Sequence, residues 1–113
     1  MSCEKKFLKE KFNDNITFTN NSSETIKSLR MWGGSRIDSP NSKIWTWENL
    51  SPNKTVDVTF NIKRDIGEPE GSIYYYAIFH NNDTVKGGTY FTNWQMSSFE
   101  NVSILRDKFE ISK

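Results

Sequence analysis

One uncharged stretch, residues 71–80, restricts the folds that this chain can adopt more than any other segment. It reads Gly-Ser-Ile-Tyr-Tyr-Tyr-Ala-Ile-Phe-His, and between Ile73 and Phe79 it contains no charged residue, no glycine and no proline. Both phases of a two-residue alternation are bulky and mostly apolar, whereas a strand with one buried face alternates with polar residues. We therefore predict a central β-strand that is covered on both faces.

Shorter segments with the same two-residue period lie on either side of this stretch. The clearest is Thr55–Lys63, whose apolar residues are predicted to be buried and whose intervening polar residues are predicted to be exposed. The apolar residues are Val56, Val58, Phe60 and Ile62, and the polar ones are Thr55, Asp57, Thr59 and Asn61. Further strands are predicted at Ile16–Thr19, Thr25–Trp32, Lys43–Glu48, Thr84–Thr92, Val102–Leu105 and Phe109–Ile111.

Irregular positions interrupt two of these strands. Ile26 is out of phase within Thr25–Trp32, which indicates a bulge or an edge effect, and Gly33-Gly34-Ser35 is expected to break this strand. Asn81-Asn82-Asp83 has the composition of a hairpin turn, so the following strand should return antiparallel to the central one. Gly87-Gly88 in that returning strand predicts a bulge or the close approach of another backbone.

The spacing of these segments indicates the fold class. Strands recur about every 8 to 14 residues between turns rich in asparagine, glycine, proline and serine, and no segment predicts a helix of about ten residues. A chain of 113 residues forms one domain with one core. We predict an all-β fold, an immunoglobulin-like antiparallel β-sandwich of seven or eight strands at residues 15–113, preceded by a charged tail at residues 1–14. The alternative is a small β-barrel.

The charge and the cysteine content argue against several classes of protein. The formal net charge is +1, which disfavours a nucleic-acid-binding protein that neutralises phosphates. Single-stranded nucleic acid stacked on an aromatic sheet face is disfavoured for the same reason. The single cysteine, Cys3, rules out an intrachain disulfide and a cysteine-based zinc site. No apolar run reaches the roughly 18 residues of a membrane-spanning helix.

Residues suited to catalysis or metal binding are sparse. His80, at the end of the central strand, is the only histidine, and no G-x-S-x-G motif is present to supply a nucleophile. Asp65, Glu68 and Glu70 lie in one loop, where carboxylates can ligate calcium. Their spacing matches no calcium-binding loop, so a solvated acidic loop is the favoured interpretation. We expect no enzymatic activity, no cofactor and no metal.

Aromatic residues are the most informative feature for function. They make up 14% of the chain, and four of them are tryptophans: Trp32, Trp45, Trp47 and Trp94. A sandwich of this size has room for one or two tryptophans in its core, so at least one should reach the surface. Exposed aromatic side chains beside loops rich in asparagine and serine bind sugars by stacking or anchor protein interfaces. We therefore take the four tryptophans and Arg36 as candidate binding residues. The alternative is that the tryptophans plug the ends of the sandwich.

The N-terminal residues Ser2-Cys3-Glu4-Lys5-Lys6 resemble the start of a mature bacterial lipoprotein, in which a small residue precedes an acylated cysteine and a charged tether follows. The resemblance implies that Cys3 carries a lipid, which would be the protein's sole membrane contact. It also implies a location in the cell envelope, facing the periplasm or the cell surface. Met1 would then stand in place of the removed signal peptide. The alternative is a native cytoplasmic start at Met1.

Two functions agree with these observations. The first is a non-enzymatic binding module of a small bacterial envelope lipoprotein, which contacts a protein or a carbohydrate through exposed aromatic residues. The second is an immunity-type protein that binds and occludes a partner toxin. Its interface anchors would be Trp45, Trp47, Trp94 and Arg36.

Overall fold

The computed structural model describes residues 13–35, 42–96 and 100–112. Within these ranges the chain forms nine β-strands and one short π-helix. The strands are β1 (Asn13–Asn20), β2 (Ile26–Gly34), β3 (Trp45–Leu50), β4 (Thr55–Asn61), β5 (Gly71–Phe79), β6 (Thr84–Thr92), β7 (Gln95–Met96), β8 (Glu100–Ile104) and β9 (Phe109–Ser112). The helix η1 spans Ile62–Ile66 and lies between β4 and β5.

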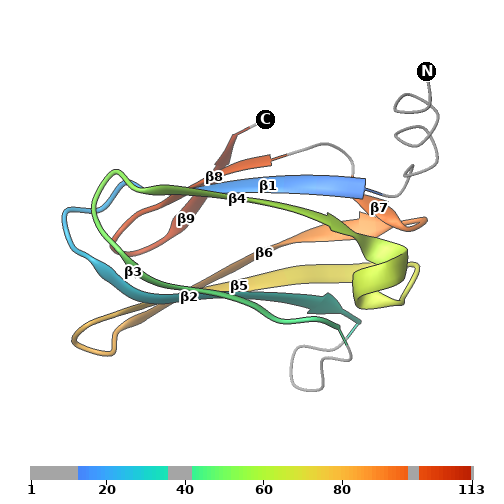
Figure 1. Cartoon of the computed structure of the whole chain (residues 1–113), viewed down its shortest axis with the longest axis horizontal. Coiled ribbons are helices and arrows are strands. Elements are labelled where there is room, and N and C mark those ends of the chain that lie inside the picture. Colours follow the sequence, from blue (N-terminus) through green and yellow to red (C-terminus); the bar gives the residue numbers. More distant parts are fainter. Residues whose placement is uncertain (1–12, 36–41, 97–99, 113) are drawn as a thin grey trace.

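The strands form two sheets that pack face to face (Figure 1). The first sheet has the strand order β4-β1-β8-β9 and the second has the order β3-β2-β5-β6-β7. The predicted all-β sandwich is confirmed, in place of the alternative small barrel. The described residues contain nine strands rather than seven or eight, because the two-residue β7 is too short to show an alternation. One pair, β1 with β8, is parallel, which the long stretch of chain between these strands permits.

β5 lies in the middle of the second sheet, between β2 and β6. One of its faces points into the sandwich and is buried, through Ile73, Tyr75, Ala77 and Phe79. The other face carries Tyr74, Tyr76 and Ile78, which are only half-buried. The prediction that both faces are covered is therefore wrong. A sandwich has two layers, so the outer face of each sheet remains open to solvent. On the second sheet, large aromatic side chains of β5 occupy this outer face.

β4 follows its predicted alternation up to its last residue. Val58 and Phe60 are buried, Val56 is half-buried, and the intervening residues Thr55, Asp57 and Thr59 are exposed. Asn61 is buried, contrary to the prediction, because its side chain caps η1: the backbone N–H of Arg64 donates to the Asn61 Oδ1 at 2.9 Å. The chain turns into η1 at this point, so Ile62 reaches the core from the helix and not from the strand.

β2 extends through the two glycines that were expected to end it. Its register with β5 shifts between Ile26 and Ser28, which confirms the bulge. Gly33 and Gly34 continue the pairing with β5. A Cβ atom on Gly33 would lie 2.6 Å from the Cδ1 of Ile66 in η1. This glycine therefore allows the helix to pack closely against the strand, and it does not terminate the strand.

β6 returns antiparallel to β5, as predicted, after the turn at Asn81-Asn82-Asp83. The pairing is continuous across Gly87-Gly88, so no bulge is present there. The expected close approach of another backbone is confirmed at Gly88, where a Cβ atom would lie 2.5 Å from the carbonyl oxygen of Ile73. A larger residue at this position would push β5 and β6 apart.

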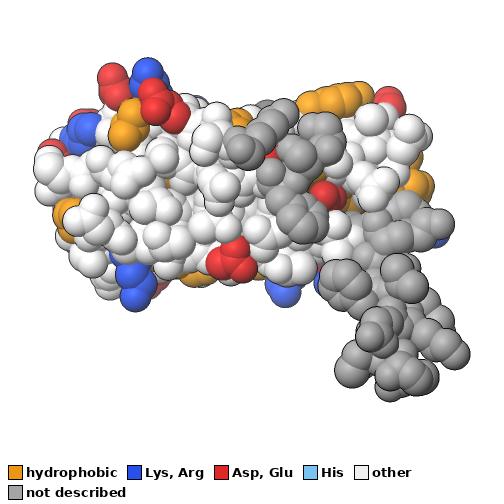
Figure 2. All heavy atoms as spheres, turned by 90° about the horizontal axis from the view of Figure 1, so that it is seen from above, with side chains coloured by type: hydrophobic (Ala, Val, Ile, Leu, Met, Phe, Trp, Pro, Cys, Tyr) orange, Lys and Arg blue, Asp and Glu red, His pale blue; other side chains and the backbone are white. Residues whose placement is uncertain are grey.

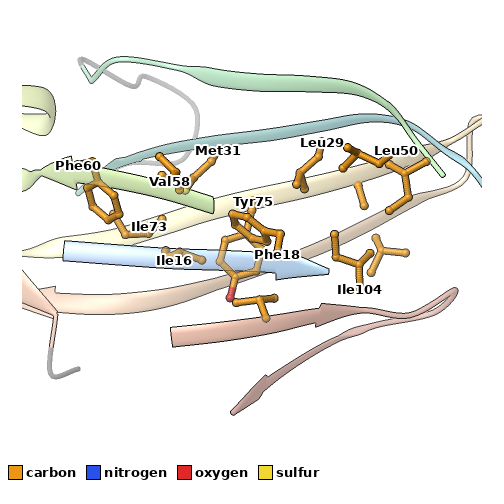
Figure 3. Close-up of a cluster of buried hydrophobic side chains, with 14 of the residues drawn as sticks. Ile16, Phe18, Leu29, Met31, Leu50, Val58, Phe60, Ile73, Tyr75 and Ile104 are labelled. Atoms are coloured by element: carbon orange, nitrogen blue, oxygen red, sulfur yellow. The ribbon is translucent and has the colours of Figure 1, made fainter. Parts of the chain in front are cut away.

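The core lies between the two sheets and is built around a few large side chains (Figure 3). Tyr75 is fully buried, and its ring packs edge-on against Phe18 and Phe109, with centroid distances of 5.1 and 4.7 Å. Apolar side chains from both sheets surround these rings, among them Ile16, Leu29, Met31, Phe60, Ile73 and Ile104. Both layers thus contribute to one continuous core, as a sandwich requires.

β1 begins earlier than predicted, at Asn13, and Asp14 within it is buried. The expected boundary between tail and domain, after residue 14, therefore falls inside a strand. Cys3 and Arg36 lie outside the described residues. No helix in the described part of the chain is long and apolar enough to span a membrane.

Candidate functional site

Trp45 and Trp47 lie on β3 and point to the same side of the strand, towards the core. Both are half-buried. Trp45 packs against Phe60 with a centroid distance of 5.6 Å, and Trp47 packs against Phe18 at 5.8 Å. The Nζ of Lys43 lies 5.5 Å from the centroid of Trp45. These two tryptophans therefore cover the core along the edge strand β3.

Trp94 lies in the turn between β6 and β7 and is also half-buried against the core. Its backbone has a φ of 66°, and its N–H donates to the carbonyl oxygen of Pro69 at 2.9 Å. The Nζ of Lys63 lies 5.5 Å from the centroid of its indole ring. Trp94 thus connects the β6–β7 turn to the loop that precedes β5.

Trp32 has a different position, on the outer face of the second sheet. Only 7% of its surface is exposed, yet it is not part of the core between the sheets. Its ring lies 4.9 Å from that of Tyr76 and 5.9 Å from that of Tyr74. Its Nε1 is buried without a hydrogen-bond partner. The four tryptophans therefore do not form one surface, since three pack against the core and Trp32 belongs to a separate aromatic group.

This aromatic group continues across β5 and β6. In the sheet register Trp32 lies opposite Tyr74, and Tyr74 lies opposite Gly88. One pair further along, Ser72 lies opposite Tyr90, whose side chain is 60% exposed. A hollow of about 410 Å³ opens here on the sheet surface. We call it the tyrosine hollow; its walls include Tyr74, Tyr76 and Tyr90, and the rest of its lining is Ser72, Lys86, Gly87, Gly88 and Thr89.

The shape of the tyrosine hollow follows from the sequence of β6. Gly88 lies between the strand positions of Lys86 and Tyr90 and has no side chain, which leaves open space opposite Tyr74. Tyr90 and the β5 tyrosines then stand around this gap as walls. A concave surface lined by aromatic rings and a few polar groups is the usual form of a small-molecule site.

Two cations flank Tyr76, at one end of the hollow. Tyr76 lies opposite Arg30 on β2 and opposite Lys86 on β6. The Nζ of Lys86 lies 5.2 Å from the centroid of the Tyr76 ring, within the range of a cation–π contact. Neither cation forms an ion pair with a carboxylate of the described residues. Lys86 lines the hollow, so its charge can meet an anionic group that enters there, and Arg30 adds a second charge on the neighbouring strand β2.

The outer face of the first sheet has a different character. Figure 2 shows that uncharged polar side chains and backbone dominate the described part of this face. The Thr17 hydroxyl donates to the Asp57 carboxylate at 2.6 Å, and the hydroxyls of Thr19 and Thr55 lie 3.0 Å apart. Short side chains bonded to one another across strands leave few groups for a ligand. Of the two outer faces, as far as the structure describes them, the one on the second sheet is where aromatic rings gather.

The tyrosines of the hollow were not among the predicted site residues, although the sequence contains a signal for them. Tyr74 and Tyr76 occupy the second phase of the β5 alternation. Counting back from the Asn81-Asn82-Asp83 turn places Lys86 opposite Tyr76 and Gly88 opposite Tyr74. A register drawn from the predicted hairpin would therefore have identified this group.

In the predicted acidic loop, Asp65 and Glu68 both accept hydrogen bonds from groups of the protein. The Asp65 carboxylate accepts hydrogen bonds from the Arg64 guanidinium and the Asn61 N–H, both at 2.9 Å. The bond from Arg64 holds the pKa of Asp65 below its usual range. Glu68 accepts a hydrogen bond from the backbone N–H of Ser35 at 3.1 Å. Within the described ranges, no three histidine, cysteine or acidic residues are placed to hold a metal ion.

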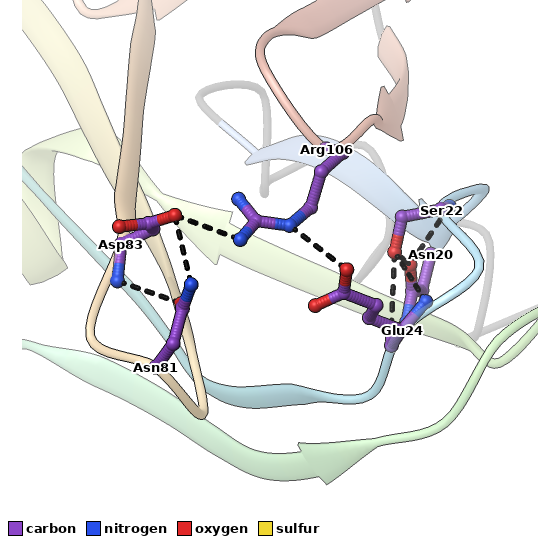
Figure 4. A network of polar contacts seen from close by, with 6 residues as sticks. All are labelled: Asn20, Ser22, Glu24, Asn81, Asp83 and Arg106. Carbon is purple, nitrogen blue, oxygen red and sulfur yellow. Dashed lines mark hydrogen bonds and ion pairs between the residues drawn. The ribbon is translucent and has the colours of Figure 1, made fainter.

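His80 is exposed in the β5–β6 turn. Asn81 and Asp83 of the same turn belong to a surface network of polar contacts (Figure 4). The guanidinium of Arg106 donates to the Asp83 carboxylate at 2.8 Å and pairs with Glu24 at 3.3 Å. The bond from Arg106 lowers the pKa of Asp83. Arg106 also lies over the ring of Phe79, at 4.4 Å from its centroid. This network links three turns at one end of the sandwich.

No family model and no curated protein sequence matches the chain. Its fold is similar to that of the NMR structure of a protein from Eubacterium rectale, with a TM-score of 0.59, 14% identity and 91% of each chain covered. It is more distantly similar to the human-specific toxin intermedilysin, with a TM-score of 0.45, 9% identity, and 88% of this chain but 23% of the toxin covered. A disulfide-locked intermedilysin mutant with human CD59 gives a TM-score of 0.48 at 9% identity, covering 88% of this chain and 24% of the toxin. The 14% identity to the Eubacterium rectale protein shows a shared fold alone.

Proposed function

We propose that this protein is a non-enzymatic binding module that holds a carbohydrate in the tyrosine hollow. The observation that carries the proposal is the grouping of Tyr74, Tyr76 and Tyr90 around a hollow of about 410 Å³ on an open sheet face. Tyr90 alone exposes 60% of its side chain to solvent. Aromatic rings of this kind stack on the apolar faces of sugar rings, and their hydroxyls hydrogen-bond to the ligand.

The chemistry of the lining favours a sugar over a purely apolar ligand. The three phenol groups and the Ser72 hydroxyl come from residues that line the same space. Arg30 and Lys86 add two positive charges beside Tyr76. A carboxylate or sulfate on the ligand would form charge-assisted hydrogen bonds with these cations, which are stronger than neutral ones. We therefore favour an acidic carbohydrate.

A glycan array that contains neutral, uronic, sialylated and sulfated sugars tests this proposal. The proposal predicts that the protein retains acidic glycans and that Tyr90→Ala and Lys86→Gln reduce their binding about ten-fold or more. Ile111→Ala is the matched control, because this exposed side chain lies on the first sheet and should leave binding unchanged.

Two outcomes would overturn the carbohydrate proposal. One is binding that Tyr90→Ala leaves intact. The other is the absence of glycan binding together with capture of a protein partner that Tyr90→Ala releases. The second outcome would favour the immunity-type alternative, since tyrosine and arginine are common anchors of protein interfaces.

The proposal includes a lipid anchor at Cys3, which would tether the domain to the bacterial envelope and present the hollow to the periplasm or the cell surface. The similarity of Ser2-Cys3-Glu4-Lys5-Lys6 to lipoprotein N-termini supports it. Cells that express the native gene and are fed an alkyne-labelled fatty acid should yield a labelled protein. Cys3→Ser should abolish the label, and a wild-type protein that takes up no label would refute the anchor.

A further inference from the structure

A second cavity, of about 570 Å³, lies where β6, β7 and β8 meet. Its walls come from β6 and the turn after it, from Met96 on β7 and from Glu100 on β8. Thr89 and Tyr90 border both this cavity and the tyrosine hollow. We call it the carboxylate cavity, because an acidic side chain forms part of its wall.

Glu100 is buried in this wall with only one of its two oxygens bonded. The residue is 3% exposed, and its Oε2 accepts a hydrogen bond from the Thr89 hydroxyl at 2.8 Å. Its Oε1 is buried and has no hydrogen-bond partner. An unpartnered buried carboxylate oxygen is costly, so such atoms in native proteins usually have a ligand or a water to bind.

A second carboxylate lies close to the first. Asp14 on β1 is 3% exposed, and its Oδ2 accepts a hydrogen bond from the backbone N–H of Met96 at 3.1 Å. β1 and β8 run parallel, with Ile16 opposite Glu100. Burial raises the pKa of Asp14 to about 6; the Met96 bond opposes this rise, and the charge of Glu100 adds to it.

The described groups that hydrogen-bond to this pair are neutral. The Thr89 hydroxyl and the Met96 N–H supply the hydrogen bonds. The Tyr75 hydroxyl is buried without a partner, and burial, together with the charge of Glu100, raises the pKa of Tyr75. None of the ion pairs among the described residues involves Asp14 or Glu100. Two buried negative charges without a cation are unfavourable.

We propose that the carboxylate cavity binds a small organic ammonium ion, with the Glu100 Oε1 accepting a hydrogen bond from the ammonium group and Asp14 supplying the second negative charge. An ammonium group is a donor only, and so it matches an unpartnered acceptor. Phe91 and Met96 provide apolar wall for the carbon skeleton of the ligand. A bare calcium ion would need about six to eight oxygen ligands, more than these two carboxylates supply. This inference does not depend on the tyrosine hollow.

Isothermal titration with n-butylammonium chloride at pH 7.5 tests the proposal, with calcium chloride as a parallel titrant. We expect saturable binding of the ammonium ion, weakened about ten-fold or more by Glu100→Gln. Glu110→Gln, at an exposed position on β9, is the matched control and should bind like the wild type. Asp14→Asn provides a second variant should Glu100→Gln fail to fold, and it should also weaken binding.

A protonation measurement adds a readout that a purely structural role would not change. Since the cation favours the ionised form of Asp14, binding at pH 6 should release protons, visible as a dependence of the binding heat on the buffer. Asp14→Asn should remove this dependence. Equal affinity in wild type and Glu100→Gln would overturn the proposal, as would binding of calcium without binding of the ammonium ion, or no binding of either.

Discussion

The side chain of Asn20, at the end of β1, donates a hydrogen bond of 2.9 Å to the carbonyl oxygen of Leu50, at the end of β3. The two strands belong to different sheets, and Asn20 is fully buried. Its Nδ2 also donates to the carbonyl oxygen of Glu24 at 2.9 Å, and its Oδ1 accepts from the N–H of Ser22 at 3.0 Å. This amide therefore ties the two layers together. It also holds the β1–β2 turn, where Figure 4 shows its bonds to Ser22 and Glu24.

Replacement of this amide should destabilise the whole sandwich. Asn20→Ala leaves the Leu50 carbonyl buried without its donor, and we expect a loss of about 2 to 3 kcal/mol in the free energy of unfolding. Urea denaturation followed by tryptophan fluorescence measures the change. The neighbouring Asn21→Ala is the control, since the exposed side chain of Asn21 donates at the surface to the Ser103 hydroxyl. Equal losses in both variants would contradict the role given to Asn20.

Phe60 should be one of the most costly core residues to truncate. It is fully buried on β4 and packs against Trp45. Phe60→Ala should therefore lower the free energy of unfolding by about 3 to 5 kcal/mol, because a cavity remains between the sheets. Ile44→Ala, at a side chain that is 45% exposed, should cost well under about 1 kcal/mol. A loss below about 1 kcal/mol for Phe60→Ala would place this ring at the rim of the core.

Stability should fall as the pH rises from 5 to 8. The pKa of Asp14 is raised in the folded protein from 3.8 to about 6. Folding therefore favours the protonated carboxyl group, a contribution that is full below pH 3.8 and disappears as the pH rises through 6. Between pH 5 and pH 8 the linkage relation gives a loss of about 1.4 kcal/mol. Chemical denaturation at both pH values measures it.

Asp14→Asn serves as the comparison for this pH dependence, because asparagine does not titrate. The difference in stability between the two proteins should change with pH by the amount given above. Parallel pH profiles for wild type and Asp14→Asn would show that Asp14 has an ordinary pKa in the folded state.

The alternation of apolar and polar residues was sufficient to predict most of the fold. In β4 it correctly placed Val58 and Phe60 inside and Asp57 outside, because the pleat of a strand fixes a period of two. It failed at Asn61, whose burial depends on capping a helix that no local pattern announces. The side of a strand that faces the core is thus readable from sequence, but the way the strand ends depends on tertiary contacts.

The face that we propose for binding was harder to predict for a related reason. The composition indicated more aromatic residues than the core can hold, and the tryptophans were predicted to be the exposed ones. In the structure Trp45 and Trp47 close an edge of the core, whereas Tyr74 and Tyr76 stand on the open face. A strand with bulky residues in both phases is predicted to be covered on both faces. Whether a further layer covers its second face depends on the whole fold and not on the strand's own sequence.

An NMR titration of the ¹⁵N-labelled protein with the tightest-binding acidic glycan from the array tests the central claim most directly. We predict that the largest backbone shifts fall in residues 72–76 of β5 and 86–90 of β6, the two strand segments that carry the lining of the tyrosine hollow. Tyr90→Ala should remove these shifts without changing the rest of the spectrum. Shifts that cluster instead around Trp45, Trp47 or Trp94 would contradict the assignment of the binding site to this face.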